Sequence, residues 1–169
     1  FAYTFGIGLL ITAIAGVYLL VDTRIQNHEK DVTLIYSVAQ QGMWLQSILL
    51  QTTRLAAPDT PEGIADSRAQ LKEALIAMRQ VHNSVRTMLS DSGVIHSFSK
   101  VSVLYFGGSA PLNTQLEVYL SDIERVAGSG DYHRVASELE PDSPLREQAK
   151  QLLQGFQTAV EITVDDSRN

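Results

Sequence analysis

The stretch LIYSVAQQGMWLQSILLQTTRL, residues 34–55, repeats its apolar side chains every seven residues. Alternating steps of four and three lead through Leu34, Val38, Gln41, Leu45, Ile48, Thr52 and Leu55. This spacing places side chains on one seam of an α-helix that packs against other helices. The pattern predicts a helix that ends near Ala57, because Pro58 and Pro61 cannot continue it.

Two neighbouring residues do not suit this helix. Gly42 in a helix interior costs about 1 kcal/mol relative to alanine. Gln41 lies on the apolar seam, where an unmet donor or acceptor costs roughly 1–3 kcal/mol. A polar residue in a seam can set the register of a helix pair, and it can also bind a ligand. The residues alone leave both interpretations open.

Three further segments have a helical period. The first begins after Thr60 as N-cap and Pro61, and ends near residues 91–93. The next runs from about Leu112 to the GSGD turn at residues 128–131, and the last begins at Ser143 and Pro144. Their expected inward residues are Ile64, Arg68, Leu71, Leu75, Met78, His82, Val85 and Leu89; Leu112, Leu116, Tyr119, Ile123 and Val126; and Leu145, Ala149, Leu152, Phe156, Ala159 and Thr163.

Four amphipathic helices that bury their apolar faces against one another predict an all-α, antiparallel four-helix bundle. Residues 94–111 show no helical period, and VSVLYF at residues 101–106 is interpreted as a short extended piece. A short helix is expected within DYHRVASELEP, residues 131–141.

The first 21 residues, Phe1 to Val21, contain no Lys, Arg, Asp or Glu. About 20 apolar residues suffice for a helix to cross a bilayer, so residues 1–21 are predicted to form a transmembrane helix that continues into the first bundle helix. A secretory signal is the alternative. Residues 22–169 would then form one domain. Because no basic cluster follows Val21, this domain is expected on the periplasmic side of a cell inner membrane.

Composition excludes several classes of function. The net charge of −6 argues against nucleic-acid binding, and the chain has no cysteine for a disulfide, a thiolate nucleophile or a metal site. No Gly-rich phosphate loop, HExxH or GxSxG motif is present. The Glu-x-x-His pairs of di-iron bundles are also missing. We therefore expect no enzyme, no metal and no cofactor in this chain.

His82 is the remaining candidate, because it lies on the inward face of the second predicted helix. One interpretation is a core histidine that is hydrogen-bonded to a neighbour. The other is a sensor of pH or of a ligand, since a partly buried imidazole titrates near neutrality.

Residues 35–46, IYSVAQQGMWLQ, resemble the signature I-N-x-A-G-x-Q-R-M-x-S-Q of PilJ-type sensor domains. That family forms the N-terminal domain of type IV pilus chemotaxis transducers, and it is similar to the periplasmic bundles of nitrate/nitrite sensors. Ile35, Gln41, Met43 and Gln46 match, and the small Ala39 replaces a glycine. The resemblance implies a dimeric sensory bundle with a site around these residues.

Two departures from the signature matter. Tyr36 replaces an asparagine, and Gly42 replaces the arginine that is similar in position to the anion-binding side chain of nitrate sensors. Without that guanidinium no fork for a planar anion remains, so nitrate binding is not expected. The predicted ligand-binding or dimer-contact residues are Ile35, Gln41, Gly42, Met43 and Gln46.

The expected function is that of an extracytoplasmic input domain of a membrane signalling receptor. It would form a homodimer, bind an unknown small ligand or a periplasmic partner protein, and pass a helix displacement through the membrane. Its kinase, cyclase or chemotaxis output would lie beyond Asn169. The alternative is a structural, pilus-like or assembly subunit that packs through its apolar N-terminal helix.

Overall fold

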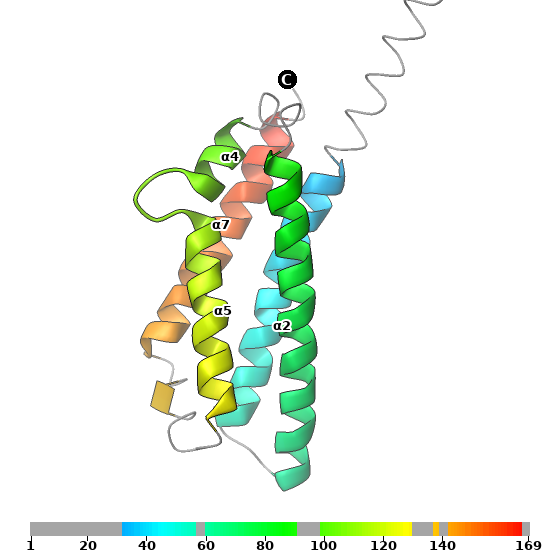
Figure 1. The fold of residues 1–169 in the computed structure, drawn as a ribbon, viewed down its shortest axis with the longest axis vertical. Helices are drawn as coiled ribbons and strands as arrows, with labels where there is room; N and C mark the ends of the chain where they lie inside the picture. Colours follow the sequence, from blue (N-terminus) through cyan, green and yellow to red (C-terminus); the bar gives the residue numbers. More distant parts are fainter. Residues whose placement is uncertain (1–31, 57–59, 91–98, 130–136, 139–141, 167–169) are drawn as a thin grey trace, which may run out of the picture. The chain divides into compact units, whose positions relative to one another are not determined.

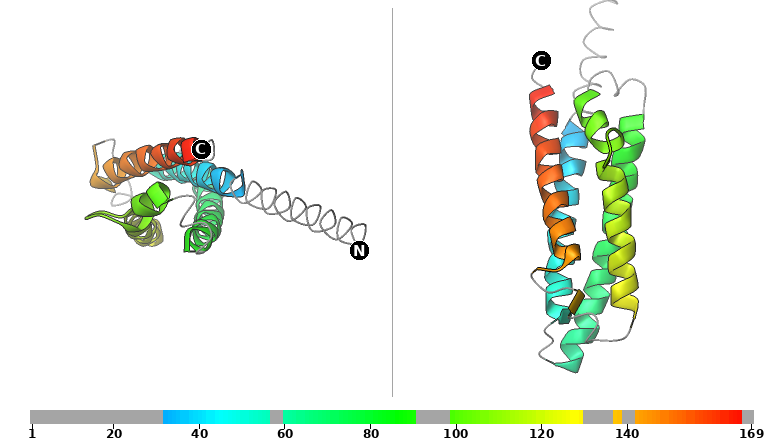
Figure 2. Two further views of the ribbon diagram at one scale, coloured as in Figure 1. Left: turned by 90° about the horizontal axis from the view of Figure 1, so that it is seen from above. Right: turned by 90° about the vertical axis from the view of Figure 1, so that its left-hand side faces the viewer.

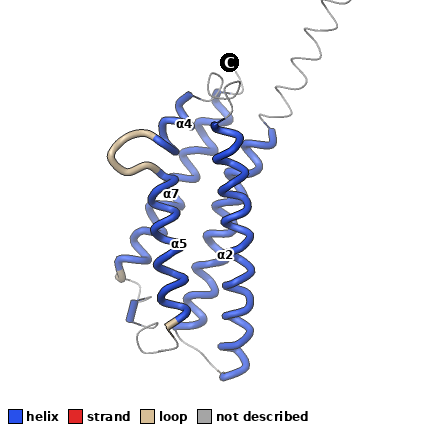
Figure 3. Tube along the Cα trace, viewed as in Figure 1, coloured by secondary structure: helices blue, strands red, loops and turns tan. Residues whose placement is uncertain are grey.

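A computed structural model of the 169-residue chain describes residues 32–56, 60–90, 99–129, 137–138 and 142–166. These residues contain five helices and no strand (Figure 3). They are helix 32–56, α2 (Pro61–Ser90), α4 (Ser99–Phe106), α5 (Leu112–Gly128) and α7 (Pro144–Asp166). Residues 137–138 are also helical. The all-helical fold class is thus confirmed for the described residues.

The chain divides into two compact units, Phe1–Thr33 and Leu34–Asn169. Nearly all of the first unit, including the predicted transmembrane segment 1–21, lies outside the described residues. Within the part of the chain that the structure describes, no helix is both long enough and apolar enough to cross a membrane.

In the second unit, the long helices pack side by side as a helical bundle (Figures 1 and 2). Helix 32–56 lies between α2 and α7, and α5 closes the bundle on the other side. Gln41 pairs with His82, and further along helix 32–56 Gln51 pairs with Gln70, so helix 32–56 and α2 run in opposite directions. The short α4 packs against α5 and α7 near one end of the bundle.

The predicted seams form the core. Every residue of the seven-residue repeat in helix 32–56 is buried, from Leu34 to Leu55. The inward residues of the last two predicted helices are buried as well, whereas in α2 Ile64 and Arg68 at its start are only partly buried. Spacing alone therefore identified the interior, because side chains three and four residues apart share one face of a helix.

The predicted helix starts are also confirmed. The amide of Gly63 donates to the hydroxyl of Thr60 at 3.0 Å, and the amide of Arg146 donates to the hydroxyl of Ser143 at 3.3 Å. Each hydroxyl satisfies an amide that has no partner within its helix. Thr60 and Ser143 thus act as N-caps for α2 and α7.

The interpretation of residues 101–106 as an extended piece was wrong, since Ser99–Phe106 form α4. This helix is apolar on most sides, with Val101 and Tyr105 buried and Val103 and Phe106 exposed. Because apolar residues lie on both the buried and the exposed faces, the sequence of this segment shows no amphipathic period. The helix ends where Gly107 donates its amide to the carbonyl of Val103 at 2.8 Å and Gly108 takes a φ of 75°.

Gly107→Ala is expected to destabilise the end of α4. A Cβ at Gly107 would lie 2.7 Å from the backbone oxygen of Val103, so the backbone would have to shift. The free energy of unfolding should fall by on the order of 1–2 kcal/mol in urea titrations followed by circular dichroism. Gly128→Ala is the matched control, because a Cβ there meets nothing within 4 Å. Equal stability of the two variants would contradict this account.

Candidate functional site

A chain of hydrogen bonds between three buried side chains and one partly buried side chain joins four helices. The hydroxyl of Tyr105 in α4 donates to Oε1 of Gln41. Nε2 of Gln41 lies 2.9 Å from Nδ1 of His82, and Nε2 of His82 lies 2.9 Å from Oδ1 of Asn113 in α5. Gln41 and Tyr105 are 0% exposed and His82 is 1% exposed. We call these four residues the polar chain.

The helix periods bring these residues together. Gln41 occupies a seam position of helix 32–56, and His82 occupies a seam position of α2. Because the two helices are antiparallel, seam residues in the first half of helix 32–56 face seam residues near the end of α2. The polar misfit of the first seam thus meets the polar residue of the second, and each satisfies the other.

Burial governs the titration of both ionisable members of the polar chain. Loss of solvation lowers the pKa of His82, and the hydrogen bond to Asn113 and the charge of Glu117 only partly oppose it. Loss of solvation likewise raises the pKa of Tyr105. Both residues are therefore held neutral near pH 7, which suits a low-dielectric interior.

An ion cluster connects the polar chain to the surface. Oε1 of Glu117 in α5 lies 3.8 Å from Nε2 of His82 and 4.0 Å from Nη1 of Arg86. The other carboxylate oxygen of Glu117 lies 3.1 Å from Arg79, which also pairs with Glu124 at 3.0 Å. The side chains of Glu117 and Arg79 are 38% and 36% exposed, so the cluster lies at the boundary between core and solvent.

The structure separates the predicted site residues into two groups. Gln41 and His82 meet in the core. Met43 and Gln46 are exposed, and Ile35 and Gly42 are half-buried. The two adjacent misfits thus have different surroundings, because Gln41 finds its partners inside its own chain while Gly42 lines the surface described next.

A groove of about 530 Å³ runs between helix 32–56 and α7. Helix 32–56 contributes Ala39, Gly42, Met43 and Gln46, and α7 contributes uncharged residues that include Gln157 and Val160. No charged side chain is among the described residues that line it. We call this surface the outer groove.

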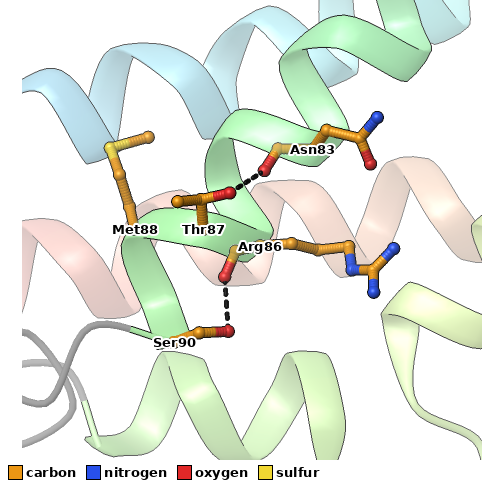
Figure 4. Close-up of a pocket in the computed structure, with 5 residues that line it drawn as sticks. All are labelled: Asn83, Arg86, Thr87, Met88 and Ser90. Carbon is orange, nitrogen blue, oxygen red and sulfur yellow. Dashed lines mark hydrogen bonds between the residues drawn. The ribbon is translucent and has the colours of Figure 1, made fainter.

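A hollow of about 730 Å³ lies near the end of α2 (Figure 4). All its described lining residues come from α2: Asn83, Arg86, Thr87, Met88 and Ser90. The hydroxyls of Thr87 and Ser90 donate to carbonyls of their own helix, as the dashed lines in Figure 4 show. Since no second element contributes converging polar groups in the described part, we place no site there.

Sequence reasoning did not find Tyr105, Asn113 or Glu117. Tyr105 lies in the segment without a helical period, so no pattern indicated that its hydroxyl turns inward. Asn113 and Glu117 are only partly buried and flank the predicted seam of α5. The one available signal was the presence of Gln41 and His82 at seam positions, because buried polar side chains require partners.

In the described ranges, no group of three His, Asp or Glu side chains is arranged to hold a metal ion. Comparisons of the chain with protein-family models, curated proteins and solved structures gave no match.

The lowered pKa of His82 makes stability depend on pH. The unfolded chain protonates His82 near its ordinary pKa of about 6.5, whereas the folded chain does so only at lower pH. The contribution of His82 to stability is therefore fully present above about pH 6.5. It is lost as pH falls towards the folded pKa, with a slope of at most about 1.4 kcal/mol per pH unit. Urea titrations across this range test the expectation, and His82→Gln should lack this component. Identical pH dependence in both proteins would refute it.

Gln41→Leu is expected to lower the free energy of unfolding by on the order of 2 kcal/mol or more, because it leaves His82 Nδ1 and the Tyr105 hydroxyl unsatisfied. Tyr105→Phe in the same chain should recover part of this loss, since phenylalanine has no hydroxyl to satisfy. A double-mutant cycle measured by urea unfolding should give a coupling energy of about 0.5–3 kcal/mol. Strict additivity would show that the two side chains do not interact.

Proposed function

We propose that this chain is the extracytoplasmic input domain of a membrane signalling receptor and that it works as a homodimer. Residues 1–21 anchor it in the inner membrane, and the membrane helix continues into helix 32–56 of an antiparallel, periplasmic four-helix bundle. The resemblance of residues 35–46 to the PilJ-type signature supports this proposal. The family arginine is replaced by Gly42, so the proposed stimulus is not nitrate.

One observation carries the proposal: helix 32–56 has a second seven-residue repeat on its exposed side. Tyr36, Ala39, Met43, Gln46 and Leu50 follow one another in steps of three and four, and all are exposed. Tyr36, Met43 and Leu50 are 63%, 52% and 50% exposed, although they are large and mostly apolar. A seven-residue repeat of contact positions is the pattern by which two helices pack side by side.

Gly42 supports a helix as the occupant of the outer groove. A Cβ built on Gly42 would meet nothing within 4 Å, so packing within this chain does not require a glycine there. At Gly155 in α7, by contrast, a Cβ would lie 2.6 Å from a methyl group of Leu112. A glycine that destabilises its helix by about 1 kcal/mol suits a position where a second backbone approaches closely.

The second copy of this chain is the occupant that we propose. The outer groove has no charged lining among the described residues, so two identical grooves can face each other without repulsion between like charges. Two copies anchored in one membrane present their first helices in parallel, an arrangement in which heptad seams can pack side by side. A stimulus then biases two packings of this seam, and the paired helices pass the displacement to the membrane.

Cysteine crosslinking of the full chain in lipid nanodiscs tests the dimer, since the natural sequence has no cysteine to give background. Ala39→Cys, Met43→Cys and Gln46→Cys, each made singly, should form disulfide-linked dimers under mild oxidation, because a disulfide needs Cβ atoms about 4 Å apart. Ile76→Cys in α2 is the matched control, with an exposure of 50% against 52% for Met43.

The expected result is a higher dimer yield at the three positions of the outer repeat than at Ile76. Equal yields at all four positions would indicate random collision, and no dimer at any position would exclude this face as the interface. Either result would remove the main support for the homodimeric input domain.

A further inference from the structure

The hydrogen bonds of the polar chain all point in one direction. Oε1 of Gln41 accepts from Tyr105, which leaves the amide group of Gln41 to donate to Nδ1 of His82. An amide nitrogen can only donate, so Nδ1 must be bare and the neutral ring must have its hydrogen on Nε2. Nε2 then donates to Oδ1 of Asn113. The order is Tyr105 to Gln41 to His82 to Asn113.

A second proton on His82 is incompatible with this order. Both ring nitrogens of the imidazolium are donors, so the new N–H of Nδ1 would face the amide hydrogens of Gln41. The conflict is relieved if the amide of Gln41 turns by half a rotation and places Oε1 against Nδ1. The amide nitrogen then faces the oxygen of Tyr105, which changes from donor to acceptor.

Tyr105 is at the end of the polar chain, so its hydrogen bond to Gln41 is the one that the rotated amide breaks. Its hydroxyl hydrogen loses its acceptor, while the side chain is 0% exposed and therefore has no contact with bulk solvent. The bond to Gln41 is the hydrogen bond described for this hydroxyl. A buried donor without a partner is costly, so it destabilises the packed position of α4 relative to one in which the hydroxyl reaches solvent.

We propose that protonation of His82 reverses the polar chain and releases α4 from the bundle, so that the input domain responds to acid. This deepens the proposed sensory function and rests on it for its biological meaning. α4 suits such a response, because it has eight residues and only Val101 and Tyr105 of it are buried. Gly107 and Gly108 follow it directly.

The groups around His82 set the conditions of the switch. α5 presents the carboxylate of Glu117 at 3.8 Å, and the guanidinium groups of Arg79 and Arg86 in α2 act on the ring through their charge. The hydroxyl of Tyr105 in α4 bonds to Gln41 and is linked to the ring through that amide. Helix 32–56 contributes the uncharged Gln41, and no described side chain of α7 is bonded to the ring. The carboxylate favours the imidazolium, whereas the two arginines and burial oppose it.

Hydrogen exchange of the full chain, incorporated into nanodiscs, tests the proposal at about pH 7.5 and about pH 5, with rates corrected for the intrinsic effect of pH. Protection of the amides of residues 99–106 should fall by about tenfold or more at the lower pH. The amides in the centre of α2 and α5 should remain equally protected at both pH values. Nitrogen NMR of labelled histidine, recorded in parallel, identifies the tautomer and follows the protonation of His82.

Two variants serve as controls. His82→Gln should keep α4 equally protected at both pH values, because glutamine does not titrate. Tyr105→Phe should make the protection of α4 weak and independent of pH, because the bond that the proton breaks is already absent. If His82→Gln does not fold, the NMR titration of the wild type still relates the protonation of His82 to the protection of α4.

Three results would overturn the proposal: protonation of His82 without loss of protection in α4, no protonation of His82 while the chain stays folded at about pH 5, or loss of protection spread evenly over all helices. These results are distinct from failure of the proposed function. Release of α4 by acid, combined with no crosslinking at Met43→Cys, would retain the switch and reject the dimeric input domain.

Discussion

The hydrogen bond between Gln41 and His82 is the constraint on which helix packing around α4 depends. Apolar seams allow helices to slide past one another by a turn, because one leucine packs much like the next. A buried amide that must meet a buried imidazole removes this freedom, since any other register leaves both groups without partners. The two ends of the polar chain extend the same constraint to α4 through Tyr105 and to α5 through Asn113. The three hydrogen bonds of the polar chain thus constrain how four helices are aligned.

The sequence predicted most of the fold and about half of the candidate site. The helices and their buried faces followed from the spacing of apolar residues, and their starts followed from Thr60 and Ser143, because these signals are local. Gln41 and His82 were identified because a polar residue on an apolar seam conflicts with its position. Their mutual contact was not predicted, since it joins residues 41 positions apart and depends on the relative register of two helices. Tyr105 had no local signal, because an apolar helix of eight residues lacks the contrast between faces that reveals a period.

The adjacent positions 41 and 42 illustrate why two departures from a pattern need separate explanations. Residues next to each other in a helix point about 100° apart, so they seldom share surroundings. Gln41 is explained within the chain, since the polar chain satisfies both ends of its amide. Gly42 is not, because its missing side chain leaves open space in the outer groove. The first misfit is therefore explained by the fold, and the second lies on the face where we propose that a second copy packs.

Helix 32–56 links the polar chain on its inner face to the outer groove on its outer face. Its inner repeat contains Gln41 of the polar chain, and its outer repeat lines the outer groove through Ala39, Met43 and Gln46. A change of packing on one side is therefore transmitted to the other through a rigid helix. Close-packed interfaces do not deform continuously; they move between discrete arrangements. A proton on His82 alters the hydrogen bond that this ring makes with Gln41 of the helix. Gly42, which lines the outer groove, is the next residue in the same helix. Any shift or rotation that relieves the inner conflict therefore moves the surface on which a second copy would pack, and this is the coupling that an input domain needs.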